Sequence, residues 1–536
     1  MPDPKPTSQR TSSERSPKTL ASEKRGTASA HKRAKAPPPK PAGWLAYLTL
    51  IALTIGCYGP IFTSGLVWSE YDDVERSPYQ SMEKWTEAWA PQMIRYEDPI
   101  TLTSYFLERA IPLDAAVTHH AINLLLHLCA AVLLLKTLEA LKLSAAFSAA
   151  LIFALHPALL QTIFWSGYRT ELVGLVFLLV ALYLGVRNRN SRDFWTMTII
   201  SAIGYLIHPA TLVLPFLLGL CIFHQKGSFH LKDYNRLLPL LCLALFIGVW
   251  TQANRPGQEL LLNERLGIYA QNLFFYLNQA LLPLDQLLFH PFAQGEGYRV
   301  GAQNSILPFA LFIPFYVLIA IFYKKPWARG VLMGLTAYLL LSIYGITRTG
   351  TFVDGSSAHE NYLQYFTVPI ILALIICTAG GIARNMGTAG KILWYTGFGV
   401  FALLQLAITY SYAQAVSDRA QMWYRISEEW PEAWLPKLAL IDTIQESGEK
   451  SDLLSQNDII DMLTSILDQQ PDRIKERILL ARIYRDGGQK NNALVQYKRI
   501  LRDSKPTNEF LLEAATLYDE LGLTWDANNA RARMTK

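Results

Sequence analysis

The sequence predicts an all-α membrane protein, in which a polytopic bundle of about 11 spanning helices precedes a soluble helical domain. Residues 44–412 are a series of long apolar stretches, and a helix needs about 20 apolar residues to cross the hydrocarbon core. Of the whole chain, 51% is hydrophobic and only 17% is charged, whereas soluble proteins carry about 25% charged residues. Residues 472–533 repeat with a period of 34, which is typical of stacked helix pairs. These observations exclude an ordinary cytosolic enzyme.

The chain begins with a basic arm, residues 1–43, that is rich in Ser, Pro, Lys and Arg. Its ten Lys and Arg against three Asp and Glu account for the formal charge of +6 of the whole chain. Such a segment buries too little apolar area to offset its ordering entropy, so we expect a disordered cytoplasmic arm. An arm that binds anionic lipid is the alternative. Because the basic charge is confined to the arm, the folded part gives no indication of nucleic-acid binding.

Eleven apolar segments are candidate spans within residues 44–412. The fifth and sixth are short and are separated only by His208-Pro209, which predicts a tight hairpin. A further stretch, residues 266–290, is apolar but carries Asn, Gln and Asp, and it predicts an interfacial or re-entrant helix. The candidate spans are 44–64, 120–141, 145–165, 171–187, 194–208, 210–224, 236–252, 305–323, 328–347, 363–383 and 391–412.

The positive-inside rule orients these spans. The basic arm places the N-terminus in the cytoplasm, and Lys and Arg recur in every second loop, whereas the large outer loop 65–118 holds ten acidic and four basic residues. Eleven crossings then place the C-terminal domain, residues 413–536, outside. We expect an integral multi-pass protein of a bacterial inner membrane, with this domain in the periplasm; the endoplasmic reticulum is the alternative.

The repeat in the C-terminal domain indicates tetratricopeptide (TPR) architecture, in which small residues let paired helices approach and glycines occupy the turns. Residues 432–469 could form a looser preceding pair, and about three units are the minimum for a stable stack. Such a stack binds peptides, docks a protein partner or caps the membrane domain. A shift of 34 aligns Ala481 with Ala515, Tyr484 with Tyr518, Gly488 with Gly522, and Ala493 with Ala527.

Several ionisable residues stand in or beside spans, where they are costly and often functional. Asp72 and Asp73 open the first outer loop and can act as a base or hold a divalent metal; a solvated loop is the alternative. At the start of the second span, helical spacing puts His120, Asn123 and His127 on one stripe. That stripe faces a cavity or forms an interhelical hydrogen-bond seam.

A second polar group ends the third span, in the run FWSGYRTELVG. Arg169 can make a forked contact with phosphate, or instead pair with Glu171 or anchor the interface. His156 precedes a proline inside the same span. Turn and loop residues at the outer side, each with an ordinary loop role as the alternative, are His208, Glu264-Arg265, His359 and Glu360.

In this order, the features resemble the GT-C membrane glycosyltransferases, and they are most similar to the branch of transmembrane-and-TPR O-mannosyltransferase-like proteins. The resemblance rests on YDD, HHAINLLLH, LIFALHP and WSGYRTEL, and the string from 119 to 177 is its most specific part. The runs RLGIYAQNLFFYLNQALLPLDQLL and AHENYLQYFTVP also match, so that the resemblance covers residue 44 to the end.

The resemblance implies an enzyme that moves a sugar from a polyprenyl-phosphate carrier to a hydroxyl of a protein or glycan on the non-cytoplasmic face. By resemblance, Asp72 or Asp73 is the catalytic base or positions the acceptor, and Arg169 contacts the lipid phosphate. An apolar groove between spans would hold the lipid tail. The further candidates for the substrate site are His120, Asn123, His127, His156, Glu171, His208, His359 and Glu360.

The chain departs from the family at basic positions. Asp98 stands before Pro99-Ile100 in place of an arginine, Ile207-His208 replaces Lys-Glu, and Asn361 follows Glu360 in place of an arginine. Side chains that could replace the missing cations are Arg95, Arg348, His208 and His359. Without such a replacement, phosphate binding is weakened or catalysis is lost.

Two other classes of function stay open. A transporter of lipid-linked sugars would need broken mid-membrane helices and inverted repeats, and the two halves of the chain do not match convincingly. A non-catalytic assembly protein would dock its partner on the TPR domain, and the missing basic residues favour this alternative most.

Overall fold

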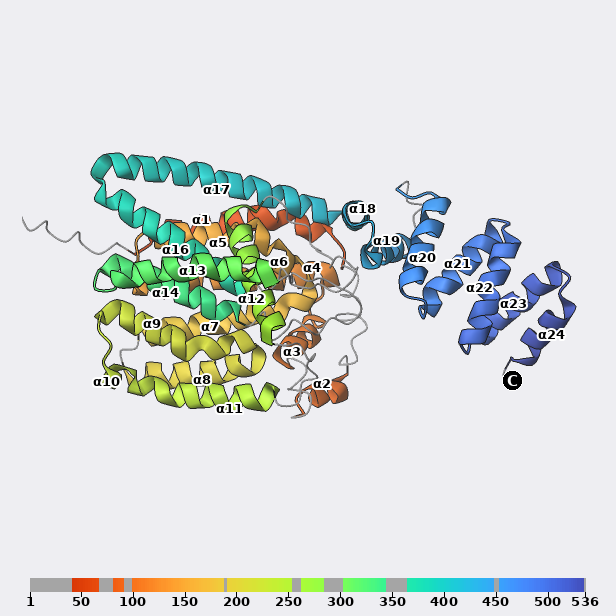
Figure 1. Cartoon of the computed structure of the whole chain (residues 1–536), viewed down its shortest axis with the longest axis horizontal. Coiled ribbons are helices and arrows are strands. Elements are labelled where there is room, and N and C mark those ends of the chain that lie inside the picture. Colours follow the sequence, from red (N-terminus) through yellow and green to blue (C-terminus); the bar gives the residue numbers. More distant parts are fainter. Residues whose placement is uncertain are drawn as a thin grey trace, which may run out of the picture. The chain divides into compact units, whose positions relative to one another are not determined.

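The computed structural model describes residues 41–66, 81–90, 99–187, 190–252, 262–283, 302–343, 364–447 and 453–534 (Figure 1). Throughout these ranges the regular elements are helices, as the sequence predicts. Nearly all of the expected basic arm, and residues 67–80 and 91–98 of the first outer loop, which include Asp72 and Asp73, lie outside the described residues.

A helix lies at each of the eleven expected spans. In chain order they are α1 (Trp44–Tyr58), α4 (Ala115–Ala140), α5 (Ala146–Ala154) with α6 (Leu160–Phe164), α7 (Arg169–Arg187), α8 (Ser191–Ile207), α9 (Leu214–Lys226), α11 (Leu238–Gln252), α13 (Ala302–Ile321), α14 (Pro326–Ser342), α16 (Gln364–Asn385) and α17 (Gly387–Ser417).

Seven stretches of the described chain are helical, long and apolar enough to cross a membrane, and the bent pair α5–α6 makes an eighth. The longest in the first half, α4, measures about 39 Å at 1.5 Å per residue, against a hydrocarbon core of about 30 Å. Helices α8 and α14 have 17 residues each, and the apolar part of α13 is shorter still. Eleven crossings therefore stay a prediction.

Two His-Pro-Ala turns shape the bundle. His156 and His208 are both in extended conformation, and each precedes a proline that starts a 3-10 helix, η4 (Pro157–Leu159) or η6 (Pro209–Val213). In both turns the imidazole Nδ1 accepts a main-chain N–H two residues on, at 3.3 Å from Ala158 and 3.1 Å from Ala210. Proline disfavours helix at the preceding residue, so α5 and α6 are bent by 53°, and the chain turns back between α8 and α9.

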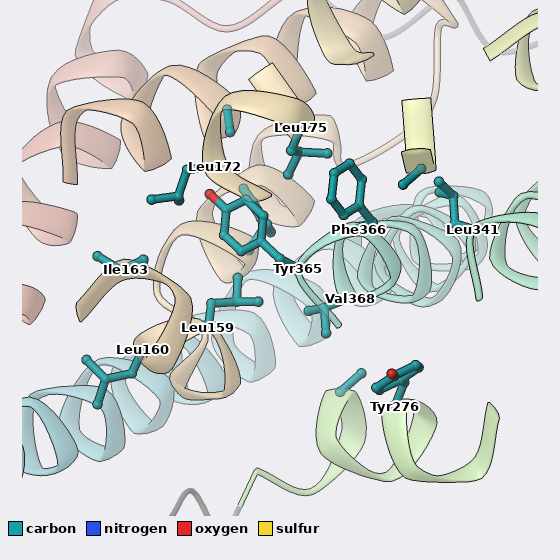
Figure 2. Close-up of a cluster of buried hydrophobic side chains, with 14 of the residues drawn as sticks. Leu159, Leu160, Ile163, Leu172, Leu175, Tyr276, Leu341, Tyr365, Phe366 and Val368 are labelled. Atoms are coloured by element: carbon teal, nitrogen blue, oxygen red, sulfur yellow. The ribbon is translucent and has the colours of Figure 1, made fainter. Parts of the chain in front are cut away.

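The bundle core lies where α4, α5, α7 and α16 pack together. Leu159, Ile163, Leu172, Tyr365 and Phe366 are buried there, as Figure 2 shows. Close packing of such apolar side chains fixes the helices that carry the polar site.

Helix α12 (Leu262–Leu281) packs on α13, α14 and α16. In Figure 1 it runs across the direction of the long helices. This orientation fits the interfacial or re-entrant helix expected for residues 266–290, although α12 ends well before residue 290.

Among the described residues, seven helices follow α17, and the last four form two hairpins that are 34 residues apart in the chain. The seven helices are α18 (Arg419–Glu429), α19 (Trp434–Ser447), α20 (Gln456–Gln469), α21 (Ile474–Asp486), α22 (Lys490–Asp503), α23 (Asn508–Glu520) and α24 (Thr524–Ala532).

The turns of the last two hairpins are the same. Gly488 follows α21 with φ of 75° and Gly522 follows α23 with φ of 72°. The next N–H donates back across the end of the helix in both, from Gln489 to the Tyr484 carbonyl (2.8 Å) and from residue 523 to residue 518 (2.7 Å). This is the Schellman turn, which favours glycine because a side chain strains the left-handed region.

Candidate functional site

Arg169 is the centre of a buried polar cluster. It is the first residue of α7 and is 0% exposed. Its Nε donates to Asn123 Oδ1 at 2.7 Å, and its Nη1 donates to Ser104 Oγ at 2.9 Å and to the Glu108 carboxylate. The Nη2 group lies 3.1 Å from His119 Nε2 and donates to the carbonyl of the same residue at 3.3 Å. Each of the three guanidinium nitrogens thus has a partner within the protein.

Glu108 and His119 complete this cluster, and the sequence analysis did not single out either one. Glu108 is the last residue of α3 (Pro99–Glu108), and its Oε2 lies 3.1 Å from His119 Nδ1. The Tyr105 ring lies under the Arg169 guanidinium at 4.6 Å. The sequence did contain a signal for His119, because it is four residues from Asn123 and shares a helix face with it. Glu108 gave no signal, because it is one of ten acidic residues in its loop.

The three residues of the predicted stripe on α4 contact different parts of the bundle. His120 Nε2 lies 3.1 Å from Ser64 Oγ, and its ring stacks on Phe164 at 5.3 Å. His127 joins two helices, with Nδ1 2.8 Å from the Tyr365 hydroxyl and Nε2 3.2 Å from the Ala154 carbonyl.

Between the two histidines, Asn123 bonds Arg169 and also donates to the Ile163 carbonyl at 3.1 Å. These contacts are those of an interhelical hydrogen-bond seam, the second of the two interpretations given above.

Glu171 pairs with His208 rather than with Arg169. Its Oε2 lies 2.5 Å from His208 Nε2, and both residues are buried. The Ala210 N–H donates to Nδ1 of the same ring. The ring also stacks on Phe366, with centroids 4.5 Å apart. Gly174 permits this approach, since a Cβ there would lie 2.7 Å from His208 Cβ.

Among the described residues, His156 forms its hydrogen bonds with main-chain groups and the Tyr58 hydroxyl. Its Nε2 donates to the Ala280 carbonyl at 3.2 Å, and its own carbonyl accepts from the Tyr58 hydroxyl at 3.2 Å. It therefore joins the α5–α6 bend to α1 and α12.

Several predicted site residues cannot be placed. Asp72, Asp73, His359 and Glu360 lie outside the described residues, and so do Arg95, Asp98, Arg348 and Asn361. Glu264 and Arg265 belong to α12, but their side chains are not described. Within the described ranges, no three His, Cys, Asp or Glu side chains are grouped so that they could hold a metal ion.

An apolar groove opens between α12, α13, α14 and α16, with a volume of about 760 Å³. Its walls are formed by side chains that include Phe274, Phe312, Phe315, Trp327, Tyr338 and Ile371. Such a lining suits a hydrocarbon chain and offers almost no polar partner.

The chain is similar to known proteins over part of its length. The family model described as a domain of unknown function (DUF6311) matches residues 117–299, which include the site residues from His119 to His208. A Caenorhabditis elegans protein named as a protein O-mannosyl-transferase is 25% identical over 160 residues, which cover 28% of this chain. The matched part spans 22% of that relative's own length.

Proposed function

We propose that this protein is a membrane glycosyltransferase of the GT-C type, which moves a sugar from a polyprenyl-phosphate donor to a hydroxyl of a protein or glycan. The observation that carries the proposal is the buried Arg169 cluster, of which Arg169, His119 and Asn123 belong to the region that matches DUF6311. The name of the nematode relative supports transfer of a sugar, and mannose is the first sugar to test.

The site suits a phosphate because a helix begins at it. Arg169 is the first residue of α7, and its partners His119 and Asn123 lie in the N-terminal half of α4. Helix N-termini carry partial positive charge and favour anions. A guanidinium at such a place would stabilise the negative charge that develops on a leaving phosphate.

In the proposed reaction, the acceptor hydroxyl attacks C1 of the sugar while the bond from C1 to the phosphate oxygen breaks. The hydroxyl proton passes to the carboxylate of Asp72 or Asp73, which acts as the general base. The electron pair of the broken bond stays on the polyprenyl phosphate, beside Arg169. We place the lipid tail in the groove between α12 and α16. Inversion at C1 is the expected outcome of this single displacement.

The proposed topology has eleven crossings, with the site and the C-terminal domain on the outer face of a bacterial inner membrane. The 34-residue hairpin repeat supports a TPR-like domain that presents the acceptor or docks a protein partner.

A non-catalytic scaffold is the second candidate. One observation favours it: the Arg169 guanidinium is fully buried and already bonded to Asn123 and Glu108. A scaffold would keep that cluster only for its stability, and the C-terminal hairpins would carry the function.

Sugar transfer by the full chain in lipid nanodiscs tests the proposal. The donor is polyprenyl-phosphate mannose with a labelled sugar, and the acceptors are Ser- and Thr-containing peptides or glycans. Transfer by the native chain, with at least a hundredfold loss in Asp72→Asn or Asp73→Asn, is the expected result. Full activity in both variants would reject the base assignment. Absence of both transfer and donor binding would favour the scaffold.

A further inference from the structure

Helix α3 is attached to the bundle by an unusual face. Besides Pro99 at its start, the buried residues Thr101, Tyr105 and Glu108 lie on one side, whereas Leu107 on the other side is 60% exposed. A helix on a protein surface normally buries its apolar stripe and exposes its polar residues. Here two of the three buried residues on that side are polar.

The contacts of that face converge on the start of α7. Ser104 and Glu108 both accept from Arg169, and Tyr105 lies under the guanidinium. One turn earlier, Thr101 Oγ1 lies 3.2 Å from Thr170 Oγ1. The ion pair between Glu108 and Arg169 is therefore the main polar attachment of α3.

Glu108 brings the negative charge to this cluster, since the other named partners of Arg169 are an amide oxygen, a hydroxyl and an imidazole. Carboxylate and phosphate compete for a guanidinium because both accept forked hydrogen bonds from it. The partners leave no nitrogen of the guanidinium open to a phosphate while Glu108 stays in place.

We propose that the Glu108 carboxylate is a built-in competitor for a monoester phosphate, which takes its place on Arg169 and releases α3 from α7. This inference rests on the proposed function, because it concerns the same arginine. It adds a regulatory residue that the sequence analysis did not identify, and it makes opening of α3 a condition of phosphate binding.

The test measures phosphate binding to the full chain and to Glu108→Gln. The probes are farnesyl phosphate, inorganic phosphate, and farnesol as the tail without a charge. Loss of the competing charge should tighten farnesyl phosphate about tenfold, equivalent to about 1.4 kcal/mol, and leave farnesol unchanged. Ser104→Ala is the matched control: it removes a neutral partner of Arg169 from the same helix and should give no such gain.

The two phosphate probes distinguish the sources of the ligand. A gain with farnesyl phosphate alone assigns the site to a lipid-borne phosphate, and a gain with both probes assigns it to the phosphate group itself. Unchanged or weaker phosphate binding in Glu108→Gln, or no binding to either chain, overturns the proposal.

A second measurement keeps Glu108 intact, in case its substitution impairs folding. Thr101 is 4% exposed, so a thiol introduced by Thr101→Cys should react slowly with a water-soluble maleimide. Saturating farnesyl phosphate should speed this labelling severalfold over the background of the five natural cysteines. If the thiol stays protected from the maleimide at saturating farnesyl phosphate, the proposed release of α3 is overturned.

The two proposals can fail separately. Release of α3 by farnesyl phosphate without sugar transfer would reject the transferase and support the competition by Glu108. Sugar transfer while the thiol of Thr101→Cys stays protected would support the transferase and reject the release of α3.

Discussion

Arg169 and Glu171 are two residues apart on α7 and do not pair with each other. Residues at this spacing point to different sides of a helix. Arg169 therefore bonds Glu108 from α3, and Glu171 lies 2.5 Å from His208 at the start of η6. Helix α7 thus carries two buried charged contacts on different faces, and each can be tested without the other.

The first pair should show strong coupling in stability. Arg169→Met leaves the Glu108 carboxylate buried without its cation, which costs about 3–5 kcal/mol. Glu108→Gln combined with Arg169→Met removes both charges and should recover much of that loss. Thermal unfolding of the four chains in nanodiscs measures the coupling; strictly additive losses would contradict it.

Because of its contact with Glu171, His208 should lose more stability than His156 when each is replaced by alanine. The two histidines occupy the same His-Pro-Ala turn, but Nε2 meets a carboxylate in one and the Ala280 carbonyl in the other. We expect His208→Ala to cost about 3–5 kcal/mol because it strands Glu171. His156→Ala should cost about 1–3 kcal/mol. Equal losses of unfolding free energy would show that only the turn matters.

The two Schellman turns predict matched effects in the C-terminal hairpins. Gly488→Ala and Gly522→Ala should each cost about 1–2 kcal/mol, because alanine is strained at positive φ. Asparagine tolerates this region better, so Gly488→Asn is the milder control. Hydrogen exchange of α21–α24 in the full chain reports the loss. A large effect at one turn alone would show that the two hairpins are not equivalent.

Acid should loosen the contact between α21 and α23. Burial raises the pKa of Glu513, but hydrogen bonds from Arg482 and Tyr497 and the nearby Arg485 outweigh burial and hold that pKa below its ordinary value. A depressed carboxyl pKa stabilises the fold above the unfolded value, and the contribution is lost as the pH falls through the folded one.

This loss falls at pH values below about 4, where glutamate in an unfolded chain takes up its proton. Resistance of α21–α23 to proteolysis, followed from pH 7 downwards with an acid-tolerant protease, should fall in the native chain. Glu513→Gln removes this part of the pH dependence, and an identical acid response in both chains would rule out Glu513 as its source.

The sequence predicts helices well and side-chain partners poorly. In the described residues, each expected span contains a helix, because long apolar runs in a membrane leave few other ways to satisfy the backbone. The spacing of Gly488 and Gly522 predicted the last two turns correctly. Both residues have a left-handed backbone conformation, which favours glycine. Partners depend on how helices rotate against each other, and composition does not encode that rotation.

The site shows this limit at two residues. The sequence offered Glu171 as a partner for Arg169, because only one residue separates the two in the run YRTEL. The structure gives Arg169 the carboxylate of Glu108, which lies 61 residues away in the chain and has no distinctive local pattern. The candidate base, Asp72 or Asp73, stays a prediction from resemblance.

The turn at His208 joins three parts of the bundle through one side chain. Its Nδ1 accepts the Ala210 N–H, its Nε2 lies 2.5 Å from the Glu171 carboxylate of α7, and its ring stacks on Phe366 of α16. A rearrangement of the reversal between α8 and α9 would therefore also displace the contacts that this side chain makes with α7 and α16.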